Sequence, residues 1–543
     1  MRILFICLAL ATSAIAAPPT QYELAQQAEL AFNQGECRQA AETYLQAANA
    51  SQSAAVAARA ADVAVECDQL DTAAVAVTRW LELAPEDRNA RRFEALLAMQ
   101  QFRLQDATRA LERAMPEGAA ERDEFIDGVV PVASDAAGAY AVLRAFEPAL
   151  KFDTLGDASL TTMIELAMQA NQLKKAAQWN AVLMKRNAAE AQAQQLQSRI
   201  DALRGRADEA LQAARRAAAL DKESFRFAPA ETLAILDRKE AAYAEYSSFL
   251  DSDAADEASR RLALLAYSSG DFDDAEKRFR DRMQATAGAG EALYYLAVIA
   301  ERRGDREEAL RRYQQLIEAG AGLAVRVRAA RLQLAGGERD AAMALLDDVS
   351  LASAQQRLPT ELTRAQLLTE GGAPDDAITH LQALLQQYPG HSQVRYQLAA
   401  AQERAGRIDD AVATFDKLLA DRPGDPNLQN ALGYTLVDHG RELKRGNRLI
   451  AEALGEMPDS PAILDSMGWS LVAQKRPAAA LEYFERAYRQ LRDSEIAAHW
   501  GEALWQLGRK SEARAIWARA LVYQPDSQPL RRTIERLTAN EKS

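Results

Sequence analysis

Histidine and cysteine, on which many catalytic and metal-binding motifs depend, are scarce in this sequence. There are four histidines and three cysteines among 543 residues. No two histidines are four residues apart, which excludes the helical zinc pair in which two imidazoles share one face. The sequence also lacks the Gly-x-Ser-x-Gly elbow, the cysteine-protease signature, the phosphate-binding loop and the dinucleotide-binding glycine pattern. We therefore expect no enzymatic activity, no metal site and no cofactor, and we expect the histidines to have surface or helix-packing roles.

An excess of positive charge is also lacking. Lysine and arginine number 65 against 78 aspartates and glutamates, a formal net charge of −13. Removal of an amino-terminal segment that carries Arg2 and no acid would make this −14. Because nucleic acids and anionic lipids are bound mainly through basic residues, this balance argues against both as partners. We expect the partners to be other proteins, with basic surfaces.

Long apolar runs are missing as well, apart from a short one at the amino terminus. Arg2 precedes an apolar run at 3–11 and the small residues at 14–16, the pattern of an export signal. A bilayer span needs about 20 apolar residues, so we expect no membrane-spanning segment. Cys7 lies inside the apolar run rather than at the cleavage point, unlike the cysteine of a bacterial lipoprotein. We therefore expect residues 1–16 to be a cleaved signal peptide and the mature chain to be periplasmic.

A period of about 34 residues organises the remainder, as in tetratricopeptide repeats. Each such repeat has two helices, with an Ala-x3-aromatic pair on the second. This pair occurs at Ala40 and Tyr44, Ala275 and Phe279, Ala309 and Tyr313, Ala411 and Phe415, Ala480 and Phe484, and Ala513 and Trp517. A glycine stands five residues before the alanine at positions 35, 205, 270, 304, 337, 372, 406 and 508. Glycine there would end the first helix and let the chain turn into the second.

The period predicts an all-α fold, a tetratricopeptide-repeat superhelical solenoid of about 15 helix pairs. Residues 116–156 match the period only in length and contain Pro116, Pro131 and Pro148. We also expect the units around 225–250 and near Gly337 to be irregular. The predicted parts are the signal peptide at 1–16, an amino-terminal repeat array at 17–115, a degenerate joint at 116–156, a main repeat array at 157–527, and a capping helix and tail at 528–543.

Two cysteines remain in the mature chain, Cys37 and Cys67, and both fall at turns between helices of neighbouring repeats. A compartment outside the cytoplasm permits their oxidation, and closure of a loop of about 30 residues would stabilise this end of the chain by about 3 to 4 kcal/mol. The alternative is that they are two small buried residues. The sequence leaves both open, because it does not show whether the two Cβ atoms face each other.

The carboxy-terminal repeats contain four of the six tryptophans. Some aromatic residues there lie outside the packing positions of the repeat. Trp500 and Trp517 occupy repeat packing positions, whereas Trp469 and Trp505 lie on the stripe of their helices that we expect to face the concave side. Solenoids bind ligands on concave surfaces, and aromatic residues are favoured interface anchors. Packing is the alternative role for these aromatics. The predicted protein-binding groove consists of Asn430, Tyr434, Asp465, Trp469, Glu502 and Trp505.

The blocks at 430–436, 461–469 and 495–502, with Leu530, Thr533, Arg536 and Leu537, carry a more specific resemblance. Together they resemble the carboxy-terminal repeats of a proteobacterial envelope family. Its best-known member is the outer-membrane lipoprotein adaptor of a carboxyl-terminal processing protease. The resemblance implies a solenoid that captures and activates such a protease and brings it substrates such as peptidoglycan hydrolases. The family adaptor is anchored through a lipid-bearing cysteine, and this chain has none at its expected cleavage site.

The leading functional hypothesis is therefore a periplasmic protein-binding scaffold or adaptor that presents cell-wall enzymes to a processing protease. Association with the outer membrane stays open. The alternative is a structural component of an exopolysaccharide or pilus export assembly, since such assemblies also use these repeats. An independent hydrolase is the third hypothesis, and turnover by the isolated chain would be needed to support it.

Overall fold

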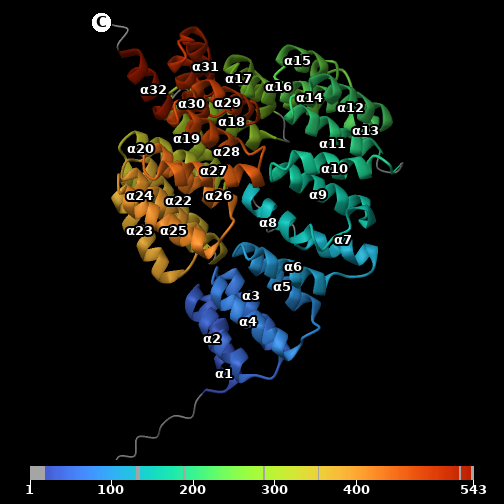
Figure 1. Cartoon of the computed structure of the whole chain (residues 1–543), viewed down its shortest axis with the longest axis vertical. Coiled ribbons are helices and arrows are strands. Elements are labelled where there is room, and N and C mark those ends of the chain that lie inside the picture. Colours follow the sequence, from blue (N-terminus) through green and yellow to red (C-terminus); the bar gives the residue numbers. More distant parts are fainter. Residues whose placement is uncertain are drawn as a thin grey trace, which may run out of the picture. The chain divides into compact units, whose positions relative to one another are not determined.

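The computed structural model describes residues 19–129, 135–186, 190–284, 288–352, 354–524 and 527–539, and these residues form helices joined by short turns, without a β-strand (Figure 1). The all-α tetratricopeptide-repeat superhelix predicted from the period is thus the observed fold. The predicted signal peptide and Pro131 lie outside the described residues. The chain divides into two compact units, Met1–Ala90 and Arg91–Ser543. No described helix has the length and hydropathy that a membrane crossing requires.

The described part of the first unit, from residue 19 on, contains two helix pairs, α1 (Gln21–Asn33) with α2 (Cys37–Ala50) and α3 (Ala54–Glu66) with α4 (Leu70–Leu83). The chain enters α1 through a capping box. The Thr20 side chain accepts from the Glu23 amide, and the Glu23 carboxylate accepts from the Thr20 amide at 2.8 Å. Cys37, at the start of α2, and Cys67, the residue that ends α3, form a disulfide with their Cα atoms 5.1 Å apart.

Helix α5 (Arg88–Gln100) begins at the boundary, and the second unit continues from it through α32. The helices of its first part are α6 (Leu104–Ala114), α7 (Ala119–Asp127), α8 (Ala136–Phe146), α9 (Asp157–Gln169), α10 (Leu173–Leu183), α11 (Glu190–Leu203), α12 (Ala207–Leu220), α13 (Lys222–Phe225), α14 (Ala228–Ile235), α15 (Lys239–Ser247), α16 (Ala255–Ser268), α17 (Phe272–Met283) and α18 (Ala289–Arg302), with a 3-10 turn, η2 (Phe152–Thr154). Those of its second part are α19 (Arg306–Glu318), α20 (Leu323–Ala335), α21 (Arg339–Ala352), α22 (Ala354–Glu370), α23 (Pro374–Gln387), α24 (Ser392–Arg404), α25 (Ile408–Asp421), α26 (Pro426–Asp438), α27 (Leu443–Glu456), α28 (Pro461–Ala473), α29 (Pro477–Gln490), α30 (Ser494–Gln506), α31 (Lys510–Tyr523) and α32 (Gln528–Thr538).

The turn inside each helix pair places one residue in the left-handed region of the backbone. The eight glycines singled out in the sequence all do this, from Gly35 with φ of 73° to Gly508 with φ of 77°. In other repeats the same place in the turn is taken by a residue with a side chain, such as Phe102 at 58°, Asn171 at 55° or Lys475 at 60°. A residue with a side chain adopts this region only at a cost in conformational free energy. Packing of the two helices must therefore determine the backbone geometry of the turn.

Small residues allow the two helices of a pair to cross closely. Gly468 in α28 faces Phe484 in α29, and a Cβ atom at Gly468 would lie 2.6 Å from the Phe484 Cε1 atom. In the next repeat Gly501 faces Trp517 in the same way. The six Ala-x3-aromatic pairs are buried, with exposed fractions of 4% or less. Each of these two repeats therefore packs one ring against the backbone of the helix before it.

Between residues 116 and 156, the described residues form the helices α7 and α8 and the 3-10 turn η2. Side chains of α8 share one hydrophobic core with those of α6 and α9. The predicted boundaries of the two arrays stay a prediction, while the division between compact units lies at residues 90 and 91.

Late helices of the second unit return to its early helices. Met457, which follows α27, belongs to the same core as residues of α8 to α11. The Tyr140 hydroxyl donates to Glu456 Oε2 at 2.6 Å, although these residues are 316 positions apart. The Arg492 guanidinium forms an ion pair with Asp237 at 2.7 Å. Contacts of this kind join successive turns of the superhelix within the second unit.

Candidate protein-binding site

Three successive first helices, α26, α28 and α30, lie side by side in the carboxy-terminal repeats. First helices stack in one layer in such solenoids, so side chains one repeat apart become neighbours. Asp465 on α28 and His499 on α30 are 34 positions apart and meet in this way. We call Tyr434, Asp438, Asp465, Trp469, Glu495 and His499 the His499 cluster.

His499 lies at the centre of this cluster and is 8% exposed. Its Nδ1 atom is 2.9 Å and 3.1 Å from the two carboxylate oxygens of Asp465. The imidazole stacks on the Trp469 indole, with ring centroids 4.5 Å apart and an angle of 22° between the planes. The Tyr434 ring approaches from α26, with its centroid 6.2 Å from that of His499. Three helices thus hold one imidazole.

Two further carboxylates hold the aromatic residues of the cluster in place. The Trp469 Nε1–H donates to Asp438 Oδ1 at 2.9 Å. The Tyr434 hydroxyl donates to Glu495 Oε1 at 3.3 Å. Asp438 and Glu495 are exposed, whereas Tyr434 and Trp469 are half-buried. The outer side of the cluster therefore carries two solvated carboxylates beside two partly accessible rings.

The electrostatics of the cluster favour a charged imidazole. Burial disfavours the charge on His499, but Asp465, Glu495 and Asp438 outweigh it and raise the His499 pKa to about 9. At neutral pH His499 is therefore protonated and its Nδ1–H donates to Asp465. Burial and the neighbouring carboxylates of Glu495 and Asp438 raise the Tyr434 pKa, so its hydroxyl stays a donor. Three carboxylates surround one imidazolium, so the cluster remains negative overall.

The structure brings Tyr434, Asp465 and Trp469 of the predicted groove together and gives the others different surroundings. Glu502 is 6% exposed and pairs with Arg536 of α32, with Arg536 Nη1 at 3.2 Å from Glu502 Oε1. It connects α30 to the last helix.

Trp505 packs on α31, which follows it in the chain. Its ring centroid is 5.5 Å from that of Trp517, and Lys510 Nζ lies 4.9 Å above the ring. Asn430 is half-buried on α26, one turn before Tyr434. Its Oδ1 atom is buried and has no hydrogen-bond partner among the described residues.

Asp438, Glu495 and His499 are the cluster residues that sequence reasoning missed. The sequence alone predicts only a surface or packing role for each histidine. A usable signal was present, because Asp465 and His499 occupy equivalent positions in adjacent repeats. An acid and a histidine one repeat apart predict a contact across the layer of first helices.

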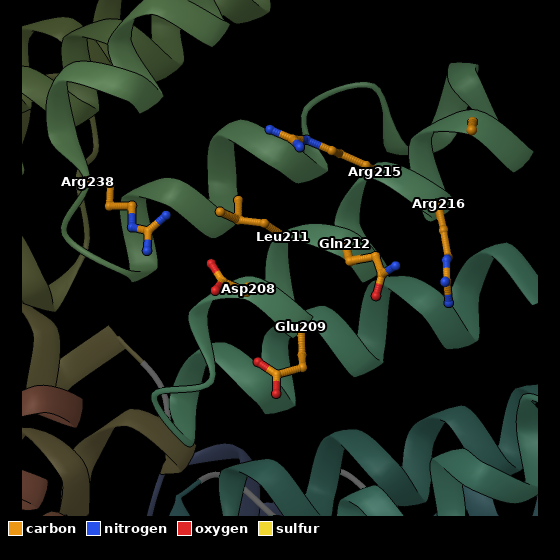
Figure 2. Close-up of a pocket in the computed structure, with 8 residues that line it drawn as sticks. Asp208, Glu209, Leu211, Gln212, Arg215, Arg216 and Arg238 are labelled. Atoms are coloured by element: carbon orange, nitrogen blue, oxygen red, sulfur yellow. The ribbon is translucent and has the colours of Figure 1, made fainter.

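Away from the His499 cluster, a hollow of about 710 Å³ lies along α12 (Figure 2). Its walls are residues of α12 and Arg238, which precedes α15. Figure 2 shows Arg215 and Arg216 leaving α12 in different directions, so their guanidinium groups do not converge on one position. This hollow has the mixed charge of an ordinary helix surface.

Comparison with known proteins finds tetratricopeptide repeats in this chain. Family models described as tetratricopeptide repeat match residues 291–319, 368–433 and 466–529. A TPR repeat-containing protein of Pseudomonas aeruginosa is similar, with 29% identity over 219 residues. That alignment covers 40% of this chain and 37% of the relative, so this chain spans well under half of the relative's length.

Among solved structures, a tetratricopeptide repeat protein from Parabacteroides merdae shares 18% identity at a TM-score of 0.33, covering 46% of this chain and 98% of that one. The APC/C hetero-tetramer Cut9–Hcn1 shares 13% identity at a TM-score of 0.32, covering 96% of this chain and 94% of that one. The repeats in this chain support a protein–protein interaction scaffold.

Proposed function

We propose that this protein is a periplasmic scaffold that holds other proteins on its layer of first helices and presents cell-wall enzymes to a carboxyl-terminal processing protease. The observation that carries the scaffold function is the His499 cluster. It assembles two aromatic rings and three carboxylates from three successive helices.

The chemistry of the cluster fits a basic segment of a partner protein. The partly accessible rings of Tyr434 and Trp469 provide the apolar anchors that dominate interface energies. The exposed carboxylates of Asp438 and Glu495 provide charge that steers and selects basic residues.

The protease adaptor role rests on the resemblance over the last repeats, between residues 430 and 537. Tyr434, Asp465 and Trp469 lie inside the blocks that carry this resemblance, and they are also the groove residues that meet in the structure. The export signal expected at 1–16 supports the periplasm as its location.

Crosslinking in intact cells tests the proposal most directly. Mass spectrometry of the crosslinked products should recover a processing protease or a peptidoglycan hydrolase joined to residues of α26, α28 or α30. Pull-down from an envelope extract with the purified mature chain should recover the same protein. Repeated recovery of neither class of enzyme would refute the adaptor role.

Charge reversal tests the surface itself with the purified partner. Glu495→Lys places a positive charge where we expect basic residues to dock, so the Kd should rise at least about tenfold, which is about 1.4 kcal/mol. Glu482→Lys on α29 is the matched control, because Glu482 is exposed and forms no ion pair among the described residues. Equal binding by the two variants would remove the His499 cluster from the interface.

A further inference from the structure

The second unit contains a seam where turns of early repeats meet late helices. The Gly205 turn lies against Arg489 of α29, and the Asp237 turn pairs with Arg492, just beyond α29. One repeat further, a Cβ atom at Gly270 would lie 2.6 Å from the Val522 side chain of α31. Equivalent turns of successive early repeats therefore contact the segment from α29 to α31.

A cavity of about 400 Å³ lies in this seam. Ile235, Leu236 and Asp237 line one side, together with residues of the Gly205 turn, while the other side comes from α29 to α31. Tyr488 and Trp500 form an aromatic wall, with ring centroids 5.8 Å apart. The lining combines these two rings and several small or aliphatic residues with charged side chains, so the cavity offers both apolar and polar contacts to a small organic ligand.

The charge of the cavity is opposite to that of the whole chain. Its lining contains the four arginines at 238, 489, 492 and 519 but only two acids, at 237 and 485. Those two acids are already engaged. Arg489 pairs with Glu485 at 2.9 Å and Arg492 with Asp237 at 2.7 Å.

Arg238 and Arg519 remain as the cationic groups available to a ligand. Neither guanidinium forms an ion pair or hydrogen bond with another residue in the described parts of the chain. They come from opposite sides of the seam, one from the turn before α15 and the other from α31. A guanidinium is a forked donor that matches carboxylate and phosphate oxygens.

We propose that this cavity binds an organic anion, consisting of a carboxylate or phosphate group on an apolar body. The anionic group takes hydrogen bonds from Arg238 and Arg519, and the apolar body packs on Tyr488 and Trp500. A free small molecule and the carboxyl terminus of a polypeptide share this chemistry. Because the lining comes from both sides of the seam, the bound anion also stabilises the contact between them.

Calorimetry on the full mature chain tests the site with matched probes. N-acetylphenylalanine and phenyl phosphate should bind, whereas N-acetylphenylalaninamide, which lacks the charge, and inorganic phosphate, which lacks the apolar body, should bind at least about tenfold more weakly. A tripeptide that ends in phenylalanine with a free carboxylate distinguishes the sources. Tighter binding than N-acetylphenylalanine indicates a polypeptide terminus, and equal binding indicates a free small molecule.

Substitutions assign the binding to this cavity. Arg238→Gln and Arg519→Gln should each weaken binding of N-acetylphenylalanine about tenfold, because each removes a charged hydrogen-bond donor. Arg216→Gln on α12 is the matched control and should bind like wild type, and circular dichroism should show all three variants folded. Unchanged binding in both cavity variants, or failure of both organic anions to bind, would overturn the proposal.

Discussion

The protonated state of His499 is the prediction that depends most directly on the tertiary structure. Asp465→Asn removes the carboxylate that accepts from the His499 Nδ1–H at 2.9 Å while keeping the size of the side chain. The remaining carboxylates of Glu495 and Asp438 then only partly offset burial. We expect the His499 pKa to fall from about 9 to below its ordinary value of 6.5.

The magnitude follows from proton linkage. A pKa difference of one between folded and unfolded states is worth about 1.4 kcal/mol. A His499 pKa of about 9 therefore corresponds to about 3 kcal/mol of stability. This contribution is complete below pH 6.5, where the unfolded chain is also protonated, and it is lost as the pH rises toward 9.

The small number of histidines makes the assay practical. With four imidazoles in the chain, ¹⁵N-histidine NMR gives a resolvable set of resonances, and the spectrum of His499→Gln assigns the one of interest. His391 provides an internal contrast, because burial lowers its pKa to about 4. Hydrogen exchange of α30 amides should rise by about 100-fold between pH 6.5 and pH 9 after correction for intrinsic exchange.

Asp438→Asn is the control, since Asp438 makes no hydrogen bond to His499 and its loss should leave most of the raised pKa in place. If the wild-type His499 resonance titrates at or below pH 6.5, the ion pair with Asp465 does not govern the cluster and the reasoning fails.

The remaining predictions concern helix packing and the first unit. Gly501→Ala should destabilise the carboxy-terminal repeats by about 1 to 3 kcal/mol, because the new Cβ would lie 2.7 Å from the Trp517 Cδ1 atom. Gly455→Ala on α27 has open space and should stabilise by up to about 1 kcal/mol; thermal unfolding compares the two, and equal effects would contradict the close crossing. Replacing Cys37 and Cys67 by serine should cost the first unit about 3 to 4 kcal/mol, since the disulfide closes a loop of 30 residues. Limited proteolysis of that unit measures this loss, and unchanged protease resistance would show that the disulfide adds little.

Much of the fold could be predicted from the sequence because the contacts that define the repeat are local. The Ala-x3-aromatic pairs and the turn glycines each report contacts within one helix pair, over a few tens of residues. Where Phe102 takes the place of the glycine, the sequence signal fades but the turn keeps its geometry, because packing of the two helices determines it. Irregular units therefore keep the repeat fold although their sequence pattern is weak.

The candidate site was less predictable, because its residues act between repeats. Spacing placed Tyr434, Asp465 and Trp469 on equivalent faces, and these three meet. The spacing could not show that Glu502 forms an ion pair with Arg536 or that Trp505 packs on α31. Both contacts depend on how the last helices lie.

The all-α class, the repeat period and the acidic charge follow from the amino-acid sequence alone. These depend on composition and on periodicity along the chain. Three-dimensional packing of the repeats brings the Asp465 carboxylate to the His499 imidazole, and it brings early turns of the second unit to its late helices. The contact between Tyr140 and Glu456 spans 316 positions, and no local pattern reports it. It results from the small rotation between successive repeats, accumulated until the superhelix returns upon itself.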